Sequence, residues 1–438
     1  MTPTLINLNE NTRTPPPADL PSEPPKRRLR ILLSAYACEP GLSSEPGVGW
    51  SMMEQVSQLH DVWVITAEEH RLPIEAELRR NPRPNVHWIF VDPPRWLTFW
   101  KKGERGRRIH YYLWQVAAYF AGRAQHKRTP FDLVHHVTYV SYWTPNFLAL
   151  LGVPFLFGPV GGGESMPAPF RETLSAEGKR FEQRRDLVRG LAHRLDPFLR
   201  LTLRRMTMVL ATTYETAAKL QDIGVSNIRL LHEVALSDDD LDRLSQTPID
   251  DNPETFSLIS MGRLIGWKGY HLSIQAFARF HRDYPNSEYW LFGTGAEYDN
   301  LRQLVRELGL EGVVHVAGAV PREELMERFE RSHVMVHPSL HDAGGWACVE
   351  AMASGRPVIC LELGGPGAQV MPEAGFVIPA RTPEQVIDEM AAAMLTLAQN
   401  PERRLEMARF AREYALRDFS WPERMKKYNA IYGELVTT

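Results

Sequence analysis

Cysteine and long apolar runs are scarce in this chain, and their scarcity restricts the expected location of the protein. The 438 residues contain three cysteines, Cys38, Cys348 and Cys360, without the spacing of a metal or redox motif. An odd count without a secretion signal predicts reduced thiols and a cytoplasmic location. No apolar run reaches the roughly 18 residues that a spanning helix requires, so the sequence predicts no transmembrane segment.

The chain also lacks a strong net charge. Its formal charge is −3, so no overall positive field attracts nucleic acid, and we expect no nucleic-acid partner. Hydrophobic residues make up 44% and charged residues 24%, which is typical of globular proteins, and the length predicts roughly two or three domains. Residues 1–27 hold seven prolines with little apolar periodicity and are predicted to be a disordered leader.

Beyond this leader, short apolar runs alternate with helical stretches, which predicts parallel sheets covered by helices. We expect a Rossmann-like domain over residues 28–236 and a second one that begins at residue 255. The acid-rich and proline-containing stretch 237–254 is predicted to be an interdomain linker. The predicted fold class is therefore α/β, with two Rossmann-like domains facing a cleft, and ligands are expected at the carboxyl ends of the strands.

Two glycine-containing motifs follow predicted strands in the second half. The first, GRLIGWKG at 262–269, places Arg263 and Lys268 five residues apart, and two cations in a flexible turn suit a diphosphate. In the second, Gly293 and Gly295 end the next strand and would allow close approach of a ligand. Each motif alone also fits an ordinary basic or tight turn.

A third motif, PSLHDAGGWACVEAMASGRP at 338–357, places Asp342 and Glu350 eight residues apart, with Gly344 and Gly345 just after the first acid. A strand, a glycine-containing loop and a helix suit a polyhydroxylated anionic ligand. Amides at a helix N-terminus bind phosphate, and carboxylates accept hydrogen bonds from sugar hydroxyls. The alternative is an ordinary turn between a strand and a helix, with two solvated acids.

Glycines in the first half supply candidates for a second part of the site. Gly47 and Gly49 precede a helix predicted from Ser51, where they could leave room for a phosphate or an acceptor at the helix N-terminus. Gly161 and Gly162 follow a later strand and are candidates for the acceptor side. The alternative for Gly47 and Gly49 is a loop that needs a positive φ, and the alternative for Gly161 and Gly162 is a flexible hinge.

Two histidines, His135 and His136, end the predicted strand at 132–137. A histidine at such a strand end could bond a sugar or shuttle a proton. The sequence does not choose between the two, and a structural role is the alternative.

Two segments of the first half are rich in basic and aromatic residues. Residues 95–128 contain nine basic residues and one acid, and residues 179–208 contain nine basic residues and three acids. Such helical surfaces suit an anionic bilayer, and no nucleic-acid motif accompanies them. We therefore expect peripheral contact with the inner face of the plasma membrane; the alternative is a solvated helix face over a core stripe.

Taken in order, these motifs resemble the family 4 glycosyltransferases, which are retaining enzymes with the GT-B fold. The resemblance covers about residues 28–436 and is strongest over 257–375, where the family's GR…KG element, its later glycine turn and its E-x7-E signature all match. The N-terminal glycine loop and the closing aromatic helix match as well. The resemblance implies an acceptor domain at 28–236, a donor-binding domain at 255–419 and a C-terminal helix, 420–438, that returns to the first domain.

The resemblance also implies a role for each position. The substrates would be a UDP- or GDP-linked sugar and an acceptor that is a glycolipid, a polysaccharide or another envelope glycan, with no metal and no cofactor. Arg263 and Lys268 would hold the diphosphate, and Glu350 would accept from the ribose hydroxyls. Asp342 and the amides of Gly344 and Gly345 would hold the transferred sugar, and the backbone at Val320 would contact the base.

The chain departs from the family pattern at three places. Asp342 replaces the usual glutamate, and Ala343 and Gly344 stand where the family has glycine and phenylalanine. The family's usual histidine falls on Val137, so that His136 or His135 would have to replace it. The altered loop at Asp342 favours one rival, a catalytically inactive GT-B protein that binds a nucleotide sugar or scaffolds an assembly. Other rivals are an epimerase or a glycogen-synthase-like polymerase. A dinucleotide oxidoreductase is not expected, because no GxGxxG motif follows the first predicted strand.

Overall fold

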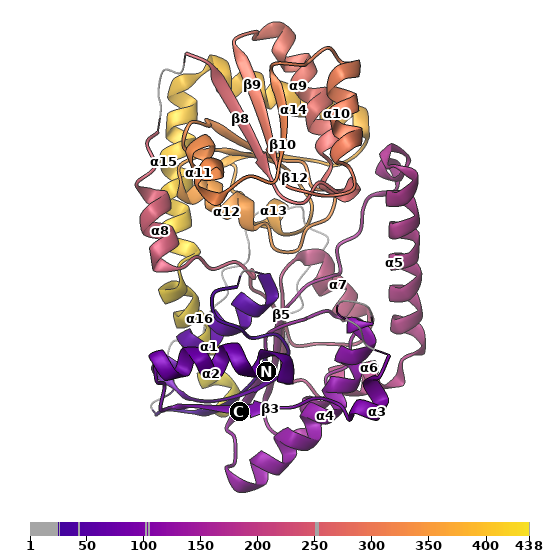
Figure 1. Cartoon of the computed structure of the whole chain (residues 1–438), viewed down its shortest axis with the longest axis vertical. Helices are drawn as coiled ribbons and strands as arrows, with labels where there is room; N and C mark the ends of the chain where they lie inside the picture. The colour runs from indigo at the N-terminus through magenta and orange to yellow at the C-terminus, as the bar shows by residue number, and fades with distance from the viewer. Residues whose placement is uncertain are drawn as a thin grey trace. The chain divides into compact units, whose positions relative to one another are not determined.

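The computed structural model describes residues 25, 27–42, 44–100, 103, 106–249 and 254–437. The predicted leader, residues 1–27, lies almost entirely outside the described residues. The chain divides into two compact units, each discontinuous in sequence (Figure 1). Unit 1 comprises Met1–Gly163, Val188–Leu231 and Met425–Thr438, and unit 2 comprises Glu164–Leu187 and His232–Arg424.

Unit 1 contains a seven-stranded parallel sheet in the order β3-β2-β1-β4-β5-β6-β7. The strands are short apolar runs that are largely buried, as expected for a parallel sheet covered on both faces. This order reverses direction between β1 and β4, which makes that point the expected ligand position of a Rossmann-like sheet. The strands are β1 (Arg30–Ser34), β2 (Asp61–Thr66), β3 (Val86–Phe90), β4 (Leu133–His136), β5 (Phe155–Val160), β6 (Met208–Ala211) and β7 (Ile228–Leu230).

Helices cover this sheet, and several begin at residues suited to the first position of a helix. The Thr213 side chain accepts from the Thr216 amide at the start of α7, and Asp196 accepts from two amides at the start of α6. The helices of unit 1 are α1 (Ser44–Leu59), α2 (Arg71–Arg80), α3 (Arg95–Thr98), α4 (Arg107–Arg128), α6 (Pro197–Leu203) and α7 (Tyr214–Asp222), with short 3₁₀ turns at Glu68–His70 and Phe147–Leu151.

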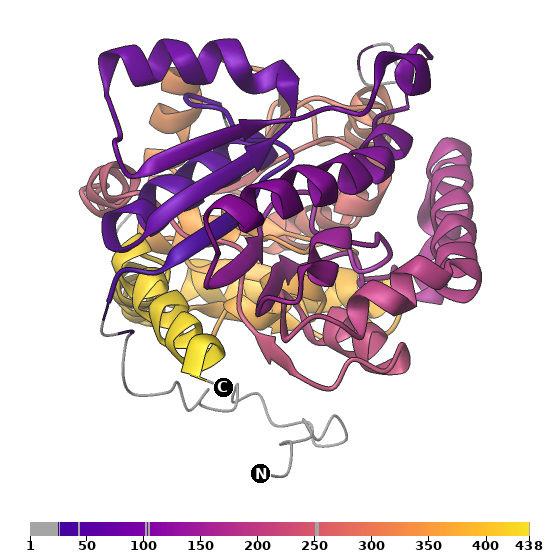
Figure 2. The same cartoon turned by 90° about the horizontal axis from the view of Figure 1, so that it is seen from below.

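The last helix, α16 (Trp421–Thr437), contributes its residues from Met425 onward to unit 1. Figure 2 shows this yellow helix beside the indigo strands of the sheet. Asn429 Oδ1 lies 2.9 Å from His60 Nε2, and Tyr432 Oη lies 2.8 Å from His135 Nδ1. Polar contacts therefore fix the end of the chain to the interior of unit 1.

Unit 2 contains a six-stranded parallel sheet in the order β10-β9-β8-β11-β12-β13. Its direction reverses between β8 and β11, so the two units repeat one plan, and the predicted pair of Rossmann-like sheets is confirmed. The strands are β8 (Phe256–Met261), β9 (Ser287–Phe292), β10 (Val314–Gly318), β11 (Val334–His337), β12 (Val358–Leu361) and β13 (Gly375–Ile378).

Two hydrophobic clusters form the core of unit 2. Thr382 and Gln385 form a reciprocal cap at the start of α14, which explains why that helix begins at Pro383, directly after Thr382. The helices are α8 (Asp238–Ser245), α9 (Tyr270–Asp283), α10 (Tyr298–Glu307), α11 (Arg322–Glu330), α12 (Trp346–Ala353), α13 (Gly364–Gln369), α14 (Pro383–Gln399) and α15 (Pro401–Asp418), with 3₁₀ turns at Ala168–Thr173 and Gly266–Lys268.

The described part of the predicted linker, 237–254, is largely helical. Ser237 caps α8, and three acids in its first turn favour the positive helix N-terminus. Leu241 and Leu244 are buried in the core of unit 2. The stretch predicted as an interdomain linker thus contains a helix that packs on unit 2, because Leu241 and Leu244 are spaced for one helix face.

Residues 164–187 also differ from the predicted plan, since this stretch of the first half packs in unit 2. Met166, Phe170 and Leu174 are buried in the same cluster as Phe256 and Tyr270. The stretch leads into α5 (Ala176–Leu195), whose residues up to Leu187 belong to unit 2. Among the described helices, none is long and apolar enough to cross a bilayer.

Candidate functional site

The best candidate site lies in unit 2, at the carboxyl ends of the strands on either side of the reversal point. The loop after β8 carries Arg263 and Lys268, and the loop after β11 carries Asp342. Backbone hydrogen bonds join these loops: the Leu340 amide donates to the Trp267 carbonyl at 2.8 Å, and the Leu264 amide donates to the Thr294 carbonyl at 2.8 Å. Segments far apart in sequence thus form one continuous platform.

Lys268 and Asp342 form an ion pair at the centre of this platform. Lys268 Nζ donates to Asp342 Oδ2, and only 14% and 19% of the two side chains are exposed. His337 Nε2 lies 3.1 Å from the same carboxylate oxygen, and the Gly345 amide lies 3.5 Å from Oδ1. The pair therefore sits in a largely desolvated setting, where charge interactions are stronger than in water.

The protonation states in this cluster follow from its contacts. Burial alone would raise the pKa of Asp342, but the Lys268 ammonium and the His337 hydrogen bond hold it far below its usual range. Burial lowers the pKa of His337 and outweighs the hydrogen bond to Asp342, which would raise it. Asp342 is therefore an anion, and His337 is a neutral ring whose Nε2–H donates to it. Sequence reasoning missed His337, although its place at the end of β11, five residues before Asp342, is a usable signal.

Arg263 belongs to the same loop and is exposed. Its guanidinium carbon lies 5.9 Å from the centroid of the Trp267 ring. An exposed guanidinium next to a half-buried ammonium gives the platform two cationic groups of different reach. Such a pair is suited to a diphosphate.

The glycine turn after β9 is required by the close approach of two backbones. Gly293 has φ of +139°, and a Cβ atom there would lie 1.8 Å from the Gly262 carbonyl oxygen. A Cβ atom at Gly295 would lie 2.1 Å from the Leu264 carbonyl oxygen. Glycine at these positions therefore lets the turn pack directly against the loop that carries Arg263 and Lys268.

Glu350 lies on α12, the helix that follows Asp342 and begins after Gly345. Its neighbours Cys348, Val349 and Ala351 are buried, whereas Glu350 is half-buried at the opposite side of that run. Val320 follows β10 and packs partly buried against the core of the unit. The structure thus places Arg263, Lys268, Asp342, Gly344, Gly345 and Glu350 in unit 2, on or after adjacent strands, and their roles stay predictions.

The two histidines predicted for the site are buried within unit 1. His136 Nδ1 lies 2.8 Å from Ser34 Oγ, and its Nε2 lies 2.8 Å from Tyr111 Oη. His135 contacts Tyr432 Oη through Nδ1 and the Gly158 carbonyl through Nε2, each at 2.8 Å. Burial lowers the pKa of His135 to about 4 and that of His136 to about 3. Both rings are therefore neutral, and each of their nitrogens has a protein partner.

The glycines of the first half have structural reasons of their own. Helix α1 begins at Ser44 and not at the predicted Ser51, so that Gly47 and Gly49 lie inside its first turns. A Cβ atom at Gly47 would lie 2.1 Å from the Leu42 carbonyl oxygen, and one at Gly49 would lie 2.2 Å from the Ala37 carbonyl oxygen. These glycines let the chain after β1 cross the helix, and the prediction that they precede it was wrong.

Gly161 and Gly162 follow β5. The Gly161 amide donates to the Val140 carbonyl at 3.1 Å, and a Cβ atom at Gly162 would lie 2.3 Å from the Trp143 ring. They fasten the loops after β4 and β5 to each other, and their predicted acceptor role stays a prediction. Within the described residues, no three His, Cys, Asp or Glu side chains gather as a metal-binding group.

Comparison with known proteins gives this geometry a context. The family model described as "Glycosyl transferases group 1" matches residues 245–414. The D-inositol 3-phosphate glycosyltransferase of Corynebacterium urealyticum is 30% identical over 185 residues, which cover 40% of this chain and 42% of that protein. The chain therefore matches less than half the length of this curated relative.

Solved structures resemble the chain over most of its length. Sucrose-phosphate synthase from Thermosynechococcus elongatus has a TM-score of 0.60 at 19% identity, covering 94% of this chain and 100% of that one. Anabaena HepE in complex with UDP-glucose has a TM-score of 0.52 at 17% identity, covering 94% and 98%. At these identities the likeness shows the fold. The chain therefore has the GT-B fold, and its residues 245–414 match the model of the glycosyl transferases group 1 family.

Proposed function

We propose that the chain is a glycosyltransferase that takes a sugar from a nucleotide-sugar donor bound to unit 2. The observation that carries this proposal is the half-buried Lys268–Asp342 pair between the loops after β8 and β11. It lies at the reversal point of the sheet, where Rossmann-like folds bind ligands. It also lies within the residues that match the glycosyltransferase family.

In the proposed reaction, positively charged side chains lie where negative charge develops on the leaving group. Departure of the nucleoside diphosphate creates negative charge, and Lys268 and Arg263 supply positive charge that stabilises it. Asp342 and the amides of Gly344 and Gly345 hold the transferred sugar. Glu350 accepts hydrogen bonds from the ribose hydroxyls. We propose transfer at the front face with retention, through an oxocarbenium-like state, without a metal ion or a further cofactor.

The donor proposed first is a UDP-sugar, with a GDP-sugar as the second choice. Anabaena HepE, which shares the fold, was solved with UDP-glucose. The proposed acceptor is a glycolipid, a polysaccharide or another envelope glycan. The curated relative from Corynebacterium urealyticum acts, by its name, on D-inositol 3-phosphate, so that a phosphorylated polyol belongs in any acceptor panel.

A thermal-shift screen of UDP- and GDP-sugars tests the donor site. A ligand that binds the folded state at a hundred times its Kd stabilises the protein by about 2.7 kcal/mol, which moves the melting temperature measurably. We expect one nucleotide class to stabilise wild type and to lose most of this effect in Lys268→Ala. Lys219→Ala, a substitution in α7 of unit 1, is the matched control. Equal shifts in all three proteins would refute the site.

The rival function is binding of a nucleotide sugar without transfer. It is favoured by one observation: Asp342, one methylene shorter than glutamate, is held by Lys268 and His337. A donor that stabilises the protein but never yields free nucleotide, with any acceptor, would establish this rival.

We also propose that unit 1 docks on an anionic membrane surface at the cytoplasmic side. On α4, Ile109, Val116 and Phe120 are exposed, and the exposed basic residues Arg123 and Lys127 continue the same helix face. These five positions are spaced by seven, four, three and four residues, which is the period of one helix face. Interfacial helices combine apolar and basic side chains in this way.

Neighbouring helices extend this surface, which we define as the exposed side chains of α3, α4 and α6 together with Phe99 and Leu195 at the adjoining ends of α3 and α5. Tyr112 of α4 donates to Asp196 at the start of α6, so these two helices lie together. Leu195, Phe198 and Leu201 are exposed there. Trp96 and Phe99, at and just after α3, are exposed by 73% and 80%. Exposed aromatic side chains of this size are typical of sites that meet a partner or a membrane.

A further inference from the structure

The start of α5, together with the stretch before it, touches the loops of unit 2 that follow β8, β9 and β11. Residues 164–187 belong to this unit although they come from the first half of the sequence. The buried side chains Met166, Phe170 and Leu174 fix the stretch in the core. His271 Nε2, at the start of α9, lies 2.9 Å from Thr173 Oγ1. The stretch is therefore an integral part of the donor-binding unit.

Phe181 contacts the loop that carries Lys268. Its ring stacks on Trp267, with centroids 4.6 Å apart and planes inclined by 19°. Phe181 is itself 43% exposed, so its burial within the core cannot account for its position. Close by, Gly266 faces Leu174, and a Cβ atom at Gly266 would lie 3.1 Å from the Leu174 side chain. Trp267 immediately precedes Lys268, so the stack fixes the backbone that carries the ammonium.

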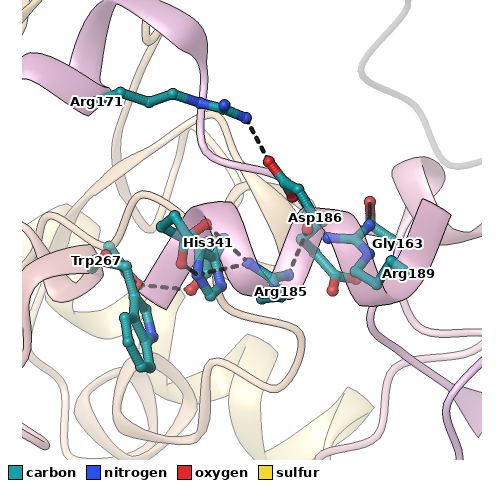
Figure 3. A network of polar contacts seen from close by, with 10 residues as sticks. Gly163, Arg171, Arg185, Asp186, Arg189, Trp267 and His341 are labelled. Atoms are coloured by element: carbon teal, nitrogen blue, oxygen red, sulfur yellow. Dashed lines mark hydrogen bonds and ion pairs between the residues drawn. The ribbon is translucent and has the colours of Figure 1, made fainter. Parts of the chain in front are cut away.

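Glu182 and Arg185 contact the loop that carries Asp342. His341 Nε2 lies 3.0 Å from Glu182 Oε1 and 2.8 Å from Arg185 Nη1, and the two charged groups pair at 3.2 Å. Figure 3 shows the Arg185 guanidinium directed at the His341 ring, beside Trp267. A carboxylate only accepts and a guanidinium only donates, so Nε2 serves one of them at a time. Either arrangement keeps His341 against α5.

The two contacts are joined to each other. The His341 ring also stacks on Trp267, with centroids 5.2 Å apart and planes inclined by 12°. The Arg185 guanidinium continues to the Glu164 carbonyl at 2.7 Å. Asp186, on the next position of the helix, is held by Arg171 at 2.6 Å. These contacts at Arg185 and Asp186 join the middle of α5 to the stretch that precedes it.

A third loop is reached by Ser175. Its Oγ donates to Glu297 Oε1 at 2.5 Å, and Glu297 ends the glycine turn that follows β9. The stretch from Ser175 to Arg185 therefore contacts the loops after β8, β9 and β11. The residues that it touches, Trp267 and His341, are the direct neighbours of Lys268 and Asp342 in sequence.

We propose that residues 175–185 clamp the three loops in the geometry that binds the donor, with Phe181 and Glu182 as positioning residues. The effect on donor binding rests on the proposed function, whereas the ordering of the three loops by residues 175–185 does not. Neither side chain is assigned a contact with substrate. Both act through Trp267 and His341, and a displacement of reacting groups by about 1 Å can reduce a rate by about a hundredfold.

Phe181→Ala, Phe181→Tyr and Glu182→Gln test the clamp, with Glu177→Gln in the exposed first turn of α5 as the matched control. Hydrogen exchange is followed in peptides covering 263–269 and 338–345. We expect exchange there to rise about tenfold in Phe181→Ala, with a melting temperature within a few degrees of wild type. Phe181→Tyr keeps the stacked ring and restores wild-type exchange. Because Glu182 is buried, Glu182→Gln can also destabilise the fold, so its result counts only where it agrees with that of Phe181→Ala.

The donor readout is steady-state kinetics. We expect Phe181→Ala and Glu182→Gln to raise KM for the donor about tenfold with a smaller change in kcat, since both loosen the loops rather than remove a reacting group. Exchange and KM within twofold of wild type in Phe181→Ala would overturn the proposal. Absence of turnover in wild type would refute the proposed function instead, and the exchange data would still decide the clamp.

Discussion

Lys268 and Asp342, 74 residues apart in sequence, form one ion pair between the two loops at the reversal point of the unit 2 sheet. The pair joins the group proposed for the diphosphate to the group proposed for the sugar. In this structure each neutralises the other, and His337 supports the carboxylate at 3.1 Å. A donor that places its diphosphate beside Lys268 would therefore compete with Asp342 for the ammonium.

This competition predicts opposite effects for two substitutions. Lys268→Ala removes the cation and should weaken UDP or GDP binding by about tenfold or more, because the nucleotide loses a charge-assisted hydrogen bond. Asp342→Asn removes the competing anion, so nucleotide binding should stay equal or become tighter while sugar transfer is lost. Isothermal titration with the nucleoside diphosphate measures the binding affinity of both variants. Equal weakening by the two substitutions would contradict an Asp342 that serves the sugar alone.

The glycine turn after β9 predicts a large cost for one added methyl group. Gly293→Ala places a Cβ atom on the Gly262 carbonyl oxygen at a positive φ, and we expect the free energy of unfolding to fall by about 2–4 kcal/mol. Gly190→Ala is the matched control, because nothing lies within 4 Å of its Cβ position on α5. Chemical denaturation compares the two, and a Gly293 variant as stable as the control would refute the close approach.

Much of the fold and part of the site could be predicted from the sequence. Buried parallel strands are continuous apolar runs, and glycine-rich turns with charges follow them, so β8, β11 and the loops with Lys268 and Asp342 were foreseeable. The contacts of Phe181 and Glu182 were not, because only the three-dimensional path of the chain brings residues of the first half to unit 2. The acid-rich α8 was missed because two leucines bury a helix whose composition indicates a linker.

The first-half predictions show a further limit. A strand with two adjacent histidines presents one to each face, and sequence alone cannot tell that both faces are buried. His135 and His136 are fully covered in unit 1. Gly47 and Gly49 were predicted to lie in a loop before the helix, because glycine is a poor helix former. The structure uses them where another backbone crosses α1.

Those buried histidines predict how stability depends on pH. Their pKa values, about 4 and about 3, lie below the value near 6.5 of the unfolded chain. Between these values the unfolded chain binds more protons, so the stability is fully present above about pH 6.5 and is lost as pH falls toward 4. Each histidine contributes a limiting slope of about 1.4 kcal/mol per pH unit. His135→Gln should flatten the pH profile of unfolding, as measured by chemical denaturation between pH 4 and 7, and a profile as steep as that of wild type would contradict the prediction.

The membrane proposal predicts salt-sensitive binding to anionic vesicles. At low salt the protein should co-sediment with vesicles that contain phosphatidylglycerol, and binding should fall as salt screens the basic side chains. Phe120→Glu, on the exposed face of α4, should reduce binding several-fold because it replaces apolar contact by repulsion. Leu72→Glu on α2, where Leu72 is 75% exposed, is the control. Absence of binding at low salt would remove the proposal.

Release of free nucleotide from a panel of UDP- and GDP-sugars tests the central claim most directly. Wild type should release nucleotide from one donor class, and Lys268→Ala should lower turnover by at least about a hundredfold, because it removes the cation that stabilises the leaving group. Glu350→Ala should abolish release with the same donor, and Lys219→Ala should leave it unchanged. Turnover in Lys268→Ala equal to wild type would contradict the account.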